Sequence, residues 1–333
     1  MERTKQTQSR AVDKTMKIYH HIEEMKASGK PIVATIGLFD GLHKGHQHLI
    51  KATQEMAHRL SAESLVVTMD KHPLALLRPD LPRPHTLCSM DQKERLIAQL
   101  GVDHLLILPF TKELAALSAT QFAQPLIERG VIGMKLGYDN RFGRKETPDL
   151  TTPQFDERLS QLGLQIERVT PFQMGDAVVS SSRIREAIAH NDLSTAGALL
   201  GRPFSITGRV KAGRQIGRTI GFPTANLIPY DPSLTLPEEG VYISEVRHGD
   251  RIYPAMSYYG STPTITPEGI PLNRIEAYLL DFQGDLYDKE IEVAFRAFIR
   301  ADQKFASLQE LQGQLQKDLT TTRTFFTHHP LTL

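Results

Sequence analysis

The sequence predicts an α/β domain with a parallel, doubly wound sheet, followed by an antiparallel β-barrel that ends in a helix. Between residues 31 and 200, strand-like runs alternate with helix-like runs, which is typical of a parallel sheet covered by helices on both faces. Beyond residue 201, strand-like runs follow one another with little helix between them, which indicates a barrel. With 333 residues, the chain is long enough for two such domains.

Composition narrows the class of protein. Hydrophobic residues make up 40% of the chain and charged residues 23%, which is typical of a soluble globular protein. The net charge of +1 does not indicate a surface that binds nucleic acids or membranes. No apolar run reaches the length that crosses a bilayer. Cys88 is the single cysteine, so an internal disulfide is excluded, a buried spectator thiol is expected and a cytoplasmic location is favoured. Small molecules are the expected partners, and the oligomeric state is left open between a monomer and a weak homo-oligomer.

The first domain is expected over residues 31–200, after an N-terminal arm at 1–30 that contains a short helix near Val12–Met25. Ligands of doubly wound sheets bind beyond the carboxyl ends of the strands, so the loops there are the first place to search for a site. Strands are expected at 32–36, 64–69, 104–109, 131–136 and 164–170, and helices near 45–60, 91–100, 114–129, 153–162 and 182–199.

The second domain is expected over residues 201–333. Gly201 is a plausible helix stop and Pro203 cannot continue a helix, so the boundary is placed there. Ser307 and Glu310 form a capping-box pattern that opens the last helix. Barrel strands are expected at 204–210, 240–246, 251–258, 274–282 and 290–299.

The loop after the first strand carries the densest motif, Gly-Leu-Phe-Asp-Gly-Leu-His-Lys-Gly-His at 37–46. A helix begins at its end, and helix N-termini favour anions. His43 and His46 are three residues apart, so both imidazoles face one side if the first turn is helical, and they could donate hydrogen bonds to a reacting triphosphate. A pair of surface histidines is the plain alternative. A metal site with His48 is weaker, because Cys and carboxylate partners at ligand spacing are missing.

This loop resembles the HxGH signature of nucleotidylyltransferases, in the form found in prokaryotic bifunctional riboflavin kinase/FMN adenylyltransferases, also called FAD synthetases. The resemblance implies catalytic roles for His43 and His46. It further implies ATP binding by Gly37, Phe39, Asp40 and Gly45.

Two later loops resemble further segments of that family. The segment 137–143 is similar to Gly-x-Asp/Asn-Phe-x-Phe-Gly, with Asn140 where the family usually has Phe, and it implies flavin or nucleotide contacts for Asp139 and Arg141. A simple turn is the alternative for this segment.

The segment 179–185 is similar to Ser-Ser-Thr-x-Ile-Arg, with Ser182 in place of Thr. Serines are good N-caps whatever the function. Together with the HxGH loop, however, the segment implies ATP binding by Ser180 and Ser181, and a catalytic Arg185 that grips phosphate oxygens.

The second half carries its own signature at 213–226. The segment lacks the Gly-Lys-Ser/Thr of a P-loop and resembles instead the riboflavin kinase segment that ends in Gly-Phe-Pro-Thr-Ala-Asn. Thr224 and Asn226 offer hard oxygen ligands suited to Mg²⁺, and an incidental hairpin is the alternative. The resemblance implies ATP binding by Gly217, Gly221, Phe222 and Pro223.

Glu276 falls where riboflavin kinases have their catalytic glutamate. A carboxylate there can accept the proton of the attacking hydroxyl, although a solvent-facing Glu is a real alternative. Arg300 and Asp302 match positions near the flavin in relatives. Three departures weaken the kinase prediction: Tyr258 stands at a usual Asn, Asp288 at a usual Gly, and Asp302 at a usual Glu.

The resemblance therefore predicts an enzyme that uses ATP and Mg²⁺ to make FMN from riboflavin and FAD from FMN, at two separate sites. Two alternatives stay open: a chain in which only the adenylyltransferase is active, and a flavin-binding regulator that has lost the chemistry. Transfer of a nucleotide to another small phosphate is disfavoured by the kinase-like second domain.

Overall fold

The computed structural model describes residues 15–25, 29–78, 80, 85–144, 150–213, 216–265 and 271–333. The chain divides into two compact units. The first comprises Met1–Leu38, Leu49–Lys71 and Glu94–Thr170, and the second comprises Phe39–His48, His72–Lys93 and Pro171–Leu333.

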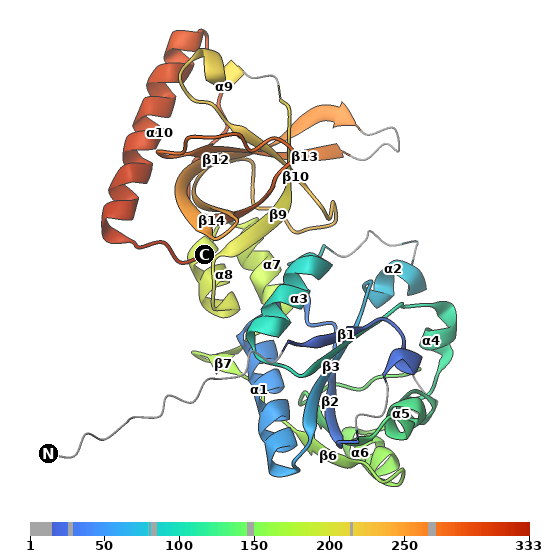
Figure 1. Cartoon of the computed structure of the whole chain (residues 1–333). Helices are drawn as coiled ribbons and strands as arrows, with labels where there is room; N and C mark the ends of the chain where they lie inside the picture. The colour runs from blue at the N-terminus through green and yellow to red at the C-terminus, as the bar shows by residue number, and fades with distance from the viewer. Residues whose placement is uncertain are drawn as a thin grey trace, which may run out of the picture. The chain divides into compact units, whose positions relative to one another are not determined.

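The first unit is built on a parallel sheet (Figure 1). Its strand order within the described residues is β1-β4-β3-β2-β5-β6, and every neighbouring pair is parallel. The predicted doubly wound sheet is therefore confirmed. The strands are β1 (Lys17–Tyr19), β2 (Ile32–Ile36), β3 (Glu63–Met69), β4 (His104–Leu108), β5 (Val131–Leu136) and β6 (Gln165–Arg168).

Helices cover both faces of this sheet, which is why every residue of β2 is buried. Val33 packs with Met56 and Ala57 of α1 (Lys44–Arg59). Ile32 and its alternate neighbours pack on the opposite face, in a cluster with α5 (Ala119–Glu128) and α6 (Thr152–Ser160). The unit also includes α4 (Lys112–Ala116), and α3 (Met90–Gln99) runs from the second unit into the first.

The strand order reverses between β2 and β5, which are neighbours although they are not consecutive. The carboxyl ends of two such strands flank the crevice where ligands of this fold bind. The loops that begin after Ile36 and Leu136 therefore start at the expected place for a site.

Three expectations about the helices are wrong. Lys17–Tyr19 forms an edge strand that pairs with β4, where a helix was expected, and Tyr19 Oη lies 3.3 Å from His104 Nδ1. Val12–Lys14 and the start of the arm lie outside the described residues. The helix expected at 114–129 is two helices, because Ser118 starts α5 with a capping box.

The helix expected at 182–199 is also two helices, α7 (Ser181–Ala189) and α8 (Leu193–Leu200). Asn191 takes the left-handed conformation between them, with φ 55°. Asp192 then caps α8 by accepting a hydrogen bond from the Thr195 N–H, at 2.9 Å. The second unit also contains α2 (Pro73–Leu77) and a hairpin of β7 (Gln173–Met174) and β8 (Ala177–Val178).

The second unit contains a closed antiparallel barrel, which confirms the second part of the predicted fold. Its order is β10-β13-β12-β11-β14-β9, and β10 pairs with β9 to close it. The strand β10 was missed by the sequence analysis. The strands are β9 (Phe204–Lys211), β10 (Ala225–Pro229), β11 (Gly240–His248), β12 (Arg251–Ile265), β13 (Pro271–Leu279) and β14 (Glu290–Ala301).

The predicted last helix, α10 (Leu308–His328), runs along the outside of the barrel (Figure 1). Ser307 caps it by accepting a hydrogen bond from the Glu310 N–H, at 3.2 Å. Inside the barrel, Leu227, Ile275 and Tyr259 belong to a buried cluster that also includes Ile184 of α7 and Leu200 of α8. The barrel interior and these two helices therefore share one core.

The close approach of β9 and β10, which closes the barrel, predicts that one methyl group added at Gly208 lowers the stability of the protein strongly. A Cβ on Gly208 would lie 2.1 Å from the Ile228 carbonyl oxygen on the paired strand β10. We expect Gly208→Ala to lower the free energy of unfolding by about 1–3 kcal/mol or more. Gly313→Ala is the matched control in α10, where a Cβ meets nothing within 4 Å, and it should raise stability by roughly 0.5–1 kcal/mol. Chemical denaturation followed by circular dichroism measures both, and equal stability of the two variants would contradict this view of barrel closure.

Candidate active sites

The histidine loop is held in an unusual backbone conformation. Phe39, Gly41 and Leu42 all have left-handed φ values, of 49°, 73° and 42°. Only glycine fits at 41, because a Cβ there would lie 2.8 Å from Leu87 Cβ. Phe39 and Leu42 are almost fully buried, and this burial offsets the cost of their backbone strain. The turn η2 (Asp40–Leu42) thereby delivers His43 to the first turn of α1.

His43 and His46 form a stacked pair. Their ring centroids lie 3.6 Å apart, and the His46 backbone N–H donates to His43 Nδ1 at 3.3 Å. His43 Nδ1 is therefore an acceptor, and in the neutral ring the proton is on Nε2. Gly45 leaves room for this ring, because a Cβ at 45 would lie 3.1 Å from it.

Both imidazoles are uncharged at neutral pH. Burial lowers the pKa of His43 to about 4, and the positive charges of Arg202 and Arg185 act in the same direction. Burial also lowers the pKa of His46 well below its ordinary value, assisted by His43 and Lys93. The pair can therefore donate hydrogen bonds without carrying charge of its own.

Asp40 joins this loop to the start of α7. Its carboxylate accepts hydrogen bonds from the Leu87 N–H at 2.7 Å and from Arg185 Nη2 at 2.5 Å. Arg185 Nε also donates to the His85 carbonyl, at 2.7 Å, and Ser181 Oγ donates to the Asp40 carbonyl, at 3.1 Å. The structure thus brings Ser181 and Arg185 to the histidine loop. Arg185 is held by protein partners on two sides.

Ser180 is the N-cap of α7 and accepts a hydrogen bond from the Arg183 N–H, at 3.4 Å. Gly37 lies in the first unit, where its N–H donates to the Val67 carbonyl at 3.1 Å. Both residues therefore have structural roles in addition to the ATP contacts that the resemblance implies.

The sequence analysis missed two cations near the histidines. Arg202 donates from Nη2 to the Gly41 carbonyl at 2.9 Å, and Lys93 is 8% exposed. Arg202 lies between the predicted helix stop at Gly201 and Pro203, and Lys93 lies in a segment without a motif. Cys88 is a buried thiol, as expected, and burial raises its pKa. The Gly41 N–H donates to its sulfur, at 3.3 Å, so this thiol supports the loop.

The loop after β5 is fixed within the first unit. Asn140 Nδ2 donates to the Ile36 carbonyl at 2.5 Å, and Arg168 donates to the Gly137 carbonyl at 2.5 Å. Asn140, where the family usually has Phe, therefore ties this loop to the carboxyl end of β2. Asp139 is exposed beside Tyr138, and Arg141 donates to the Leu150 carbonyl.

The glycine-rich segment of the barrel folds around the short helix α9 (Ile216–Thr219). The Phe222 N–H donates to the Gly217 carbonyl at 2.7 Å, and a Cβ on Gly217 would lie 2.2 Å from the Phe222 carbonyl oxygen. Gly221 is left-handed, with φ 84°. Both glycines are therefore required by the turn itself, and the turn leads through Pro223 to Thr224.

Thr224, Asn226 and Glu276 come together on neighbouring strands. Thr224 Oγ1 donates to Glu276 Oε2 at 3.2 Å, and Asn226 lies directly opposite Glu276 in the β10–β13 pair. Glu276 is half-buried, so the alternative of a simple solvent-facing Glu does not describe it.

One row of cross-strand neighbours, which we call the outer rung, extends from this cluster. Directly opposite residues of antiparallel strands share one face of the sheet. The neighbouring rung, which includes Ile275 and Tyr259, faces the barrel interior, and the outer rung faces α10. The outer rung consists in order of Asn226, Glu276, Tyr258, Val241 and Arg300.

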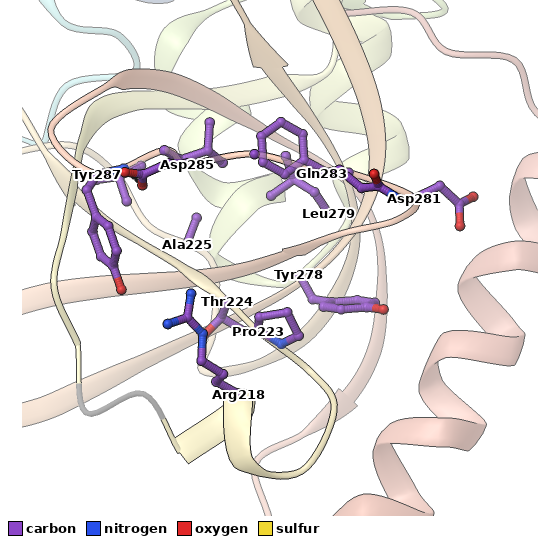
Figure 2. A pocket seen from close by; sticks show the side chains of 14 residues that line it. Arg218, Pro223, Thr224, Ala225, Tyr278, Leu279, Asp281, Gln283, Asp285 and Tyr287 are labelled. Carbon is purple, nitrogen blue, oxygen red and sulfur yellow. Dashed lines mark hydrogen bonds between the residues drawn. The ribbon is translucent and has the colours of Figure 1, made fainter.

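Two pockets meet at this cluster. The polar pocket has a volume of about 410 Å³, and Figure 2 shows Arg218 extending into it from the α9 turn. The apolar pocket has a volume of about 300 Å³ and is bordered by α10. Thr224 and Tyr278 line both pockets, and Glu276 lines the apolar one. The polar pocket is also lined by Asp281, Asp285 and Tyr287, and the apolar pocket by Phe222, Met256, Phe305, Leu311 and Leu315.

Arg300 and Asp302 line the apolar pocket. Arg300 pairs with Asp318 of α10 at 2.9 Å, and it lies over the Phe305 ring. Asp302 is exposed, and burial together with its charge raises the pKa of Tyr258 to about 12. Arg300 therefore fastens α10 to the barrel, while Asp302 places a negative charge near the Tyr258 phenol.

Asp288, at a usual Gly, keeps the backbone conformation that Gly favours. Its φ is 57°, and its carboxylate pairs with Lys211 at 2.6 Å. Aspartate tolerates the left-handed region better than most residues. This departure therefore preserves the turn after β13.

Across the described ranges, no group of three or more His, Cys, Asp or Glu side chains could hold a metal ion. A search of the same residues finds no helix with the length and apolar character needed to span a membrane.

Comparison with known proteins gives two family matches. Residues 25–183 match the FAD synthetase family, and residues 200–326 match the riboflavin kinase family. A bifunctional riboflavin kinase/FMN adenylyltransferase of Escherichia coli is 37% identical over 310 residues, which cover 92% of this chain and 96% of that protein. Its counterpart in Bacillus subtilis is 30% identical and covers 95% of this chain and 99% of that protein.

A crystal structure described as a macrolide-efflux protein from Streptococcus pneumoniae is similar over the whole length. It has a TM-score of 0.79 and 31% identity, and it covers 93% of this chain and 99% of that one. The two family matches follow each other in the order that the sequence motifs predicted. The chain therefore belongs to the family of bifunctional riboflavin kinase/FMN adenylyltransferases.

Proposed function

We propose that the barrel converts riboflavin to FMN and that the histidine loop takes part in converting FMN to FAD. The observation that carries the kinase assignment is the position of Thr224 and Glu276 where a polar and an apolar pocket meet. Phosphoryl transfer needs such a junction, because a charged nucleotide and a largely apolar flavin must meet at the reacting atoms.

In the kinase reaction, ATP occupies the polar pocket and the flavin ring the apolar pocket. The riboflavin 5′-oxygen attacks the γ-phosphorus, the bond to the ADP oxygen breaks, and Glu276 accepts the hydroxyl proton. Pockets of 300–410 Å³ are of the size that binds small molecules. The Thr224 hydroxyl, which donates to Glu276, orients this carboxylate.

The residues near Glu276 fit a magnesium ion. A hydroxyl, an amide oxygen and a carboxylate form a hard donor set, and Mg²⁺ usually takes one or two protein ligands together with phosphates and water. Thr224 and Asn226 would hold the ion through their side-chain oxygens. The ion, when bound, neutralises charge on the phosphates of ATP. Asn226 is 5% exposed, so its amide is positioned by the surrounding barrel.

In the adenylyl transfer, an FMN phosphate oxygen attacks the α-phosphorus of ATP, and pyrophosphate leaves. The nucleophile is already an anion, so positioning and electrostatic stabilisation suffice. His43 donates from Nε2–H to oxygens that gain charge. Arg185, held by Asp40 and His85, supplies a fixed positive charge. Flavin or nucleotide contacts of Asp139 and Arg141 stay predictions.

We also propose the division into an arm at 1–30, an adenylyltransferase domain at 31–200 and a kinase domain at 201–333. The matched segments 25–183 and 200–326 support it. A cytoplasmic location stays a prediction from the sequence.

Replacement of Glu276 should separate the two reactions. We expect Glu276→Gln to slow FMN formation from riboflavin by about 10²–10⁴-fold, because the amide cannot accept the proton. FAD formation from FMN should keep its wild-type rate. This reaction therefore serves as an internal control that the variant protein is folded. Chromatography of the flavins measures both rates. FMN formation at the wild-type rate in this variant would remove Glu276 from the mechanism.

Replacement of His43 or His46 should slow FAD formation and leave FMN formation intact. His43→Ala and His46→Ala should each slow FAD formation by about 10²–10³-fold, because a preorganised donor or its stacked support is lost. FMN formation should persist. His58→Ala, at the exposed end of α1, is the matched control and should leave both reactions intact. If the His43 and His46 variants behaved like the His58 variant, the histidine pair would have no catalytic role.

The buried position of His43 predicts its titration. Its pKa of about 4 in the folded protein lies below the value of about 6.5 for an unfolded histidine. The folded state therefore binds fewer protons between these values, and the contribution of His43 to stability is lost as the pH falls from about 6.5 towards 4. Nitrogen-15 NMR should find His43 neutral, with the proton on Nε2, down to about pH 5. A midpoint near 6.5 would contradict the buried, neutral pair.

A further inference from the structure

Tyr258 occupies a special place on the outer rung, directly between Glu276 and Val241. Neighbouring strands lie about 4.8 Å apart, so the Tyr258 backbone is one strand spacing from that of the proposed catalytic carboxylate. The side chain lines the apolar pocket together with Glu276. From the sequence, this residue is a departure from the family pattern that weakens the kinase prediction.

The Tyr258 ring leans along β12 over Gly260. A Cβ at 260 would lie 2.2 Å from the Tyr258 hydroxyl oxygen and 2.5 Å from Cζ, so the ring occupies the space that a side chain at 260 would need. From Tyr258 towards Gly260, the neighbouring strands run from Val241 to Gly240 and from Arg300 to Ala301. Asp302 follows Ala301 directly, so the ring points towards the end of the barrel where Asp302 lies.

Tyr258 and Asp302 both line this pocket. Burial together with the Asp302 charge raises the pKa of Tyr258 to about 12, so the phenol keeps its proton at neutral pH. A phenol oxygen and carboxylate oxygens can accept hydrogen bonds. The two side chains thus offer acceptors to a ligand that carries O–H donors.

The lining of the apolar pocket limits how a substrate can lie in it. If the reacting hydroxyl lies at Glu276, the apolar body packs on apolar side chains of the same pocket, such as Met256, Phe305 and Leu315. Tyr258 lies opposite Glu276 on the outer rung and lines the same pocket, so the segment next to the reacting hydroxyl comes close to it. In riboflavin this segment is the ribityl chain, which carries further hydroxyls beside the one that reacts.

We propose that Tyr258, together with Asp302, determines specificity for the ribityl chain by accepting hydrogen bonds from its non-reacting hydroxyls. The inference rests on the proposed kinase function of the barrel. It also accounts for two departures together. The longer Tyr replaces a usual Asn while the shorter Asp replaces a usual Glu, so the two changes complement each other in length.

The test compares riboflavin with 10-(5-hydroxypentyl)-7,8-dimethylisoalloxazine, which keeps the ring and the terminal hydroxyl but lacks the others. Tyr258→Phe should lower kcat/KM for riboflavin by roughly 5- to 30-fold, the effect of one or two hydrogen bonds. It should change kcat/KM for the hydroxypentyl analogue by less than about 2-fold, because that analogue never makes these bonds. Gly260→Ala should reproduce this selective loss, since its Cβ displaces the Tyr258 ring.

Tyr230→Phe is the matched control. Its hydroxyl also lies beside a carboxylate, donating to Glu290 at 3.0 Å, but Tyr230 lines neither of the two pockets. It should leave both flavins unaffected. Binding of the two flavins, measured by quenching of flavin fluorescence, provides a readout that does not depend on turnover.

An equal loss for riboflavin and the analogue in Tyr258→Phe, or no loss for either, would overturn the inference. Failure of the proposed function has a different signature, which is that the wild-type protein forms no FMN from riboflavin. In that case, a selective weakening of riboflavin binding in Tyr258→Phe would still support hydrogen bonds between this pair and the ribityl hydroxyls. Equal weakening for riboflavin and the analogue, or no weakening of either, would overturn the inference.

Discussion

The register of the closed barrel is the constraint on which the proposed kinase site depends. Asn226, Glu276 and Tyr258 share one face only because three strands pair in a single register. A slip of one residue would turn Glu276 into the core and bring a core residue to the pockets. The closing pair of β9 and β10 fixes this register, and α10 covers the resulting face, where Arg300 fastens it to Asp318.

The histidine loop is organised by a different constraint, which is burial. Phe39 and Leu42 hold left-handed conformations because their side chains are enclosed in the core. The same enclosure keeps His43 and His46 neutral although cations lie near them. Neutral donors in a positively charged surrounding suit a reaction in which negative charge grows on phosphate oxygens. Asp40 gives this arrangement stiffness by joining the loop to Arg185.

Much of the fold and of the candidate sites could be predicted, because apolar strands, glycine turns and polar motifs are local signals. Elements that depend on distant partners were missed. Lys17–Tyr19 is a strand only because β4 offers an edge, and β10 is a strand because β9 and β13 pair with it on its two sides. Arg202 and Lys93 reach the histidines through tertiary packing. Tyr258 lies on β12 and Asp302 follows β14, and the two residues line one pocket, which the sequence does not show.

The central claim is that one chain carries two consecutive flavin reactions at separate sites. The most direct test incubates the pure wild-type protein with ATP and MgCl₂, once with riboflavin and once with FMN, and separates the flavins by chromatography. The account predicts FMN followed by FAD from riboflavin, and FAD from FMN. FAD from FMN alone would mean that the barrel binds flavin without phosphorylating it. No new flavin from either substrate, under oxidising and reducing conditions, would contradict the account.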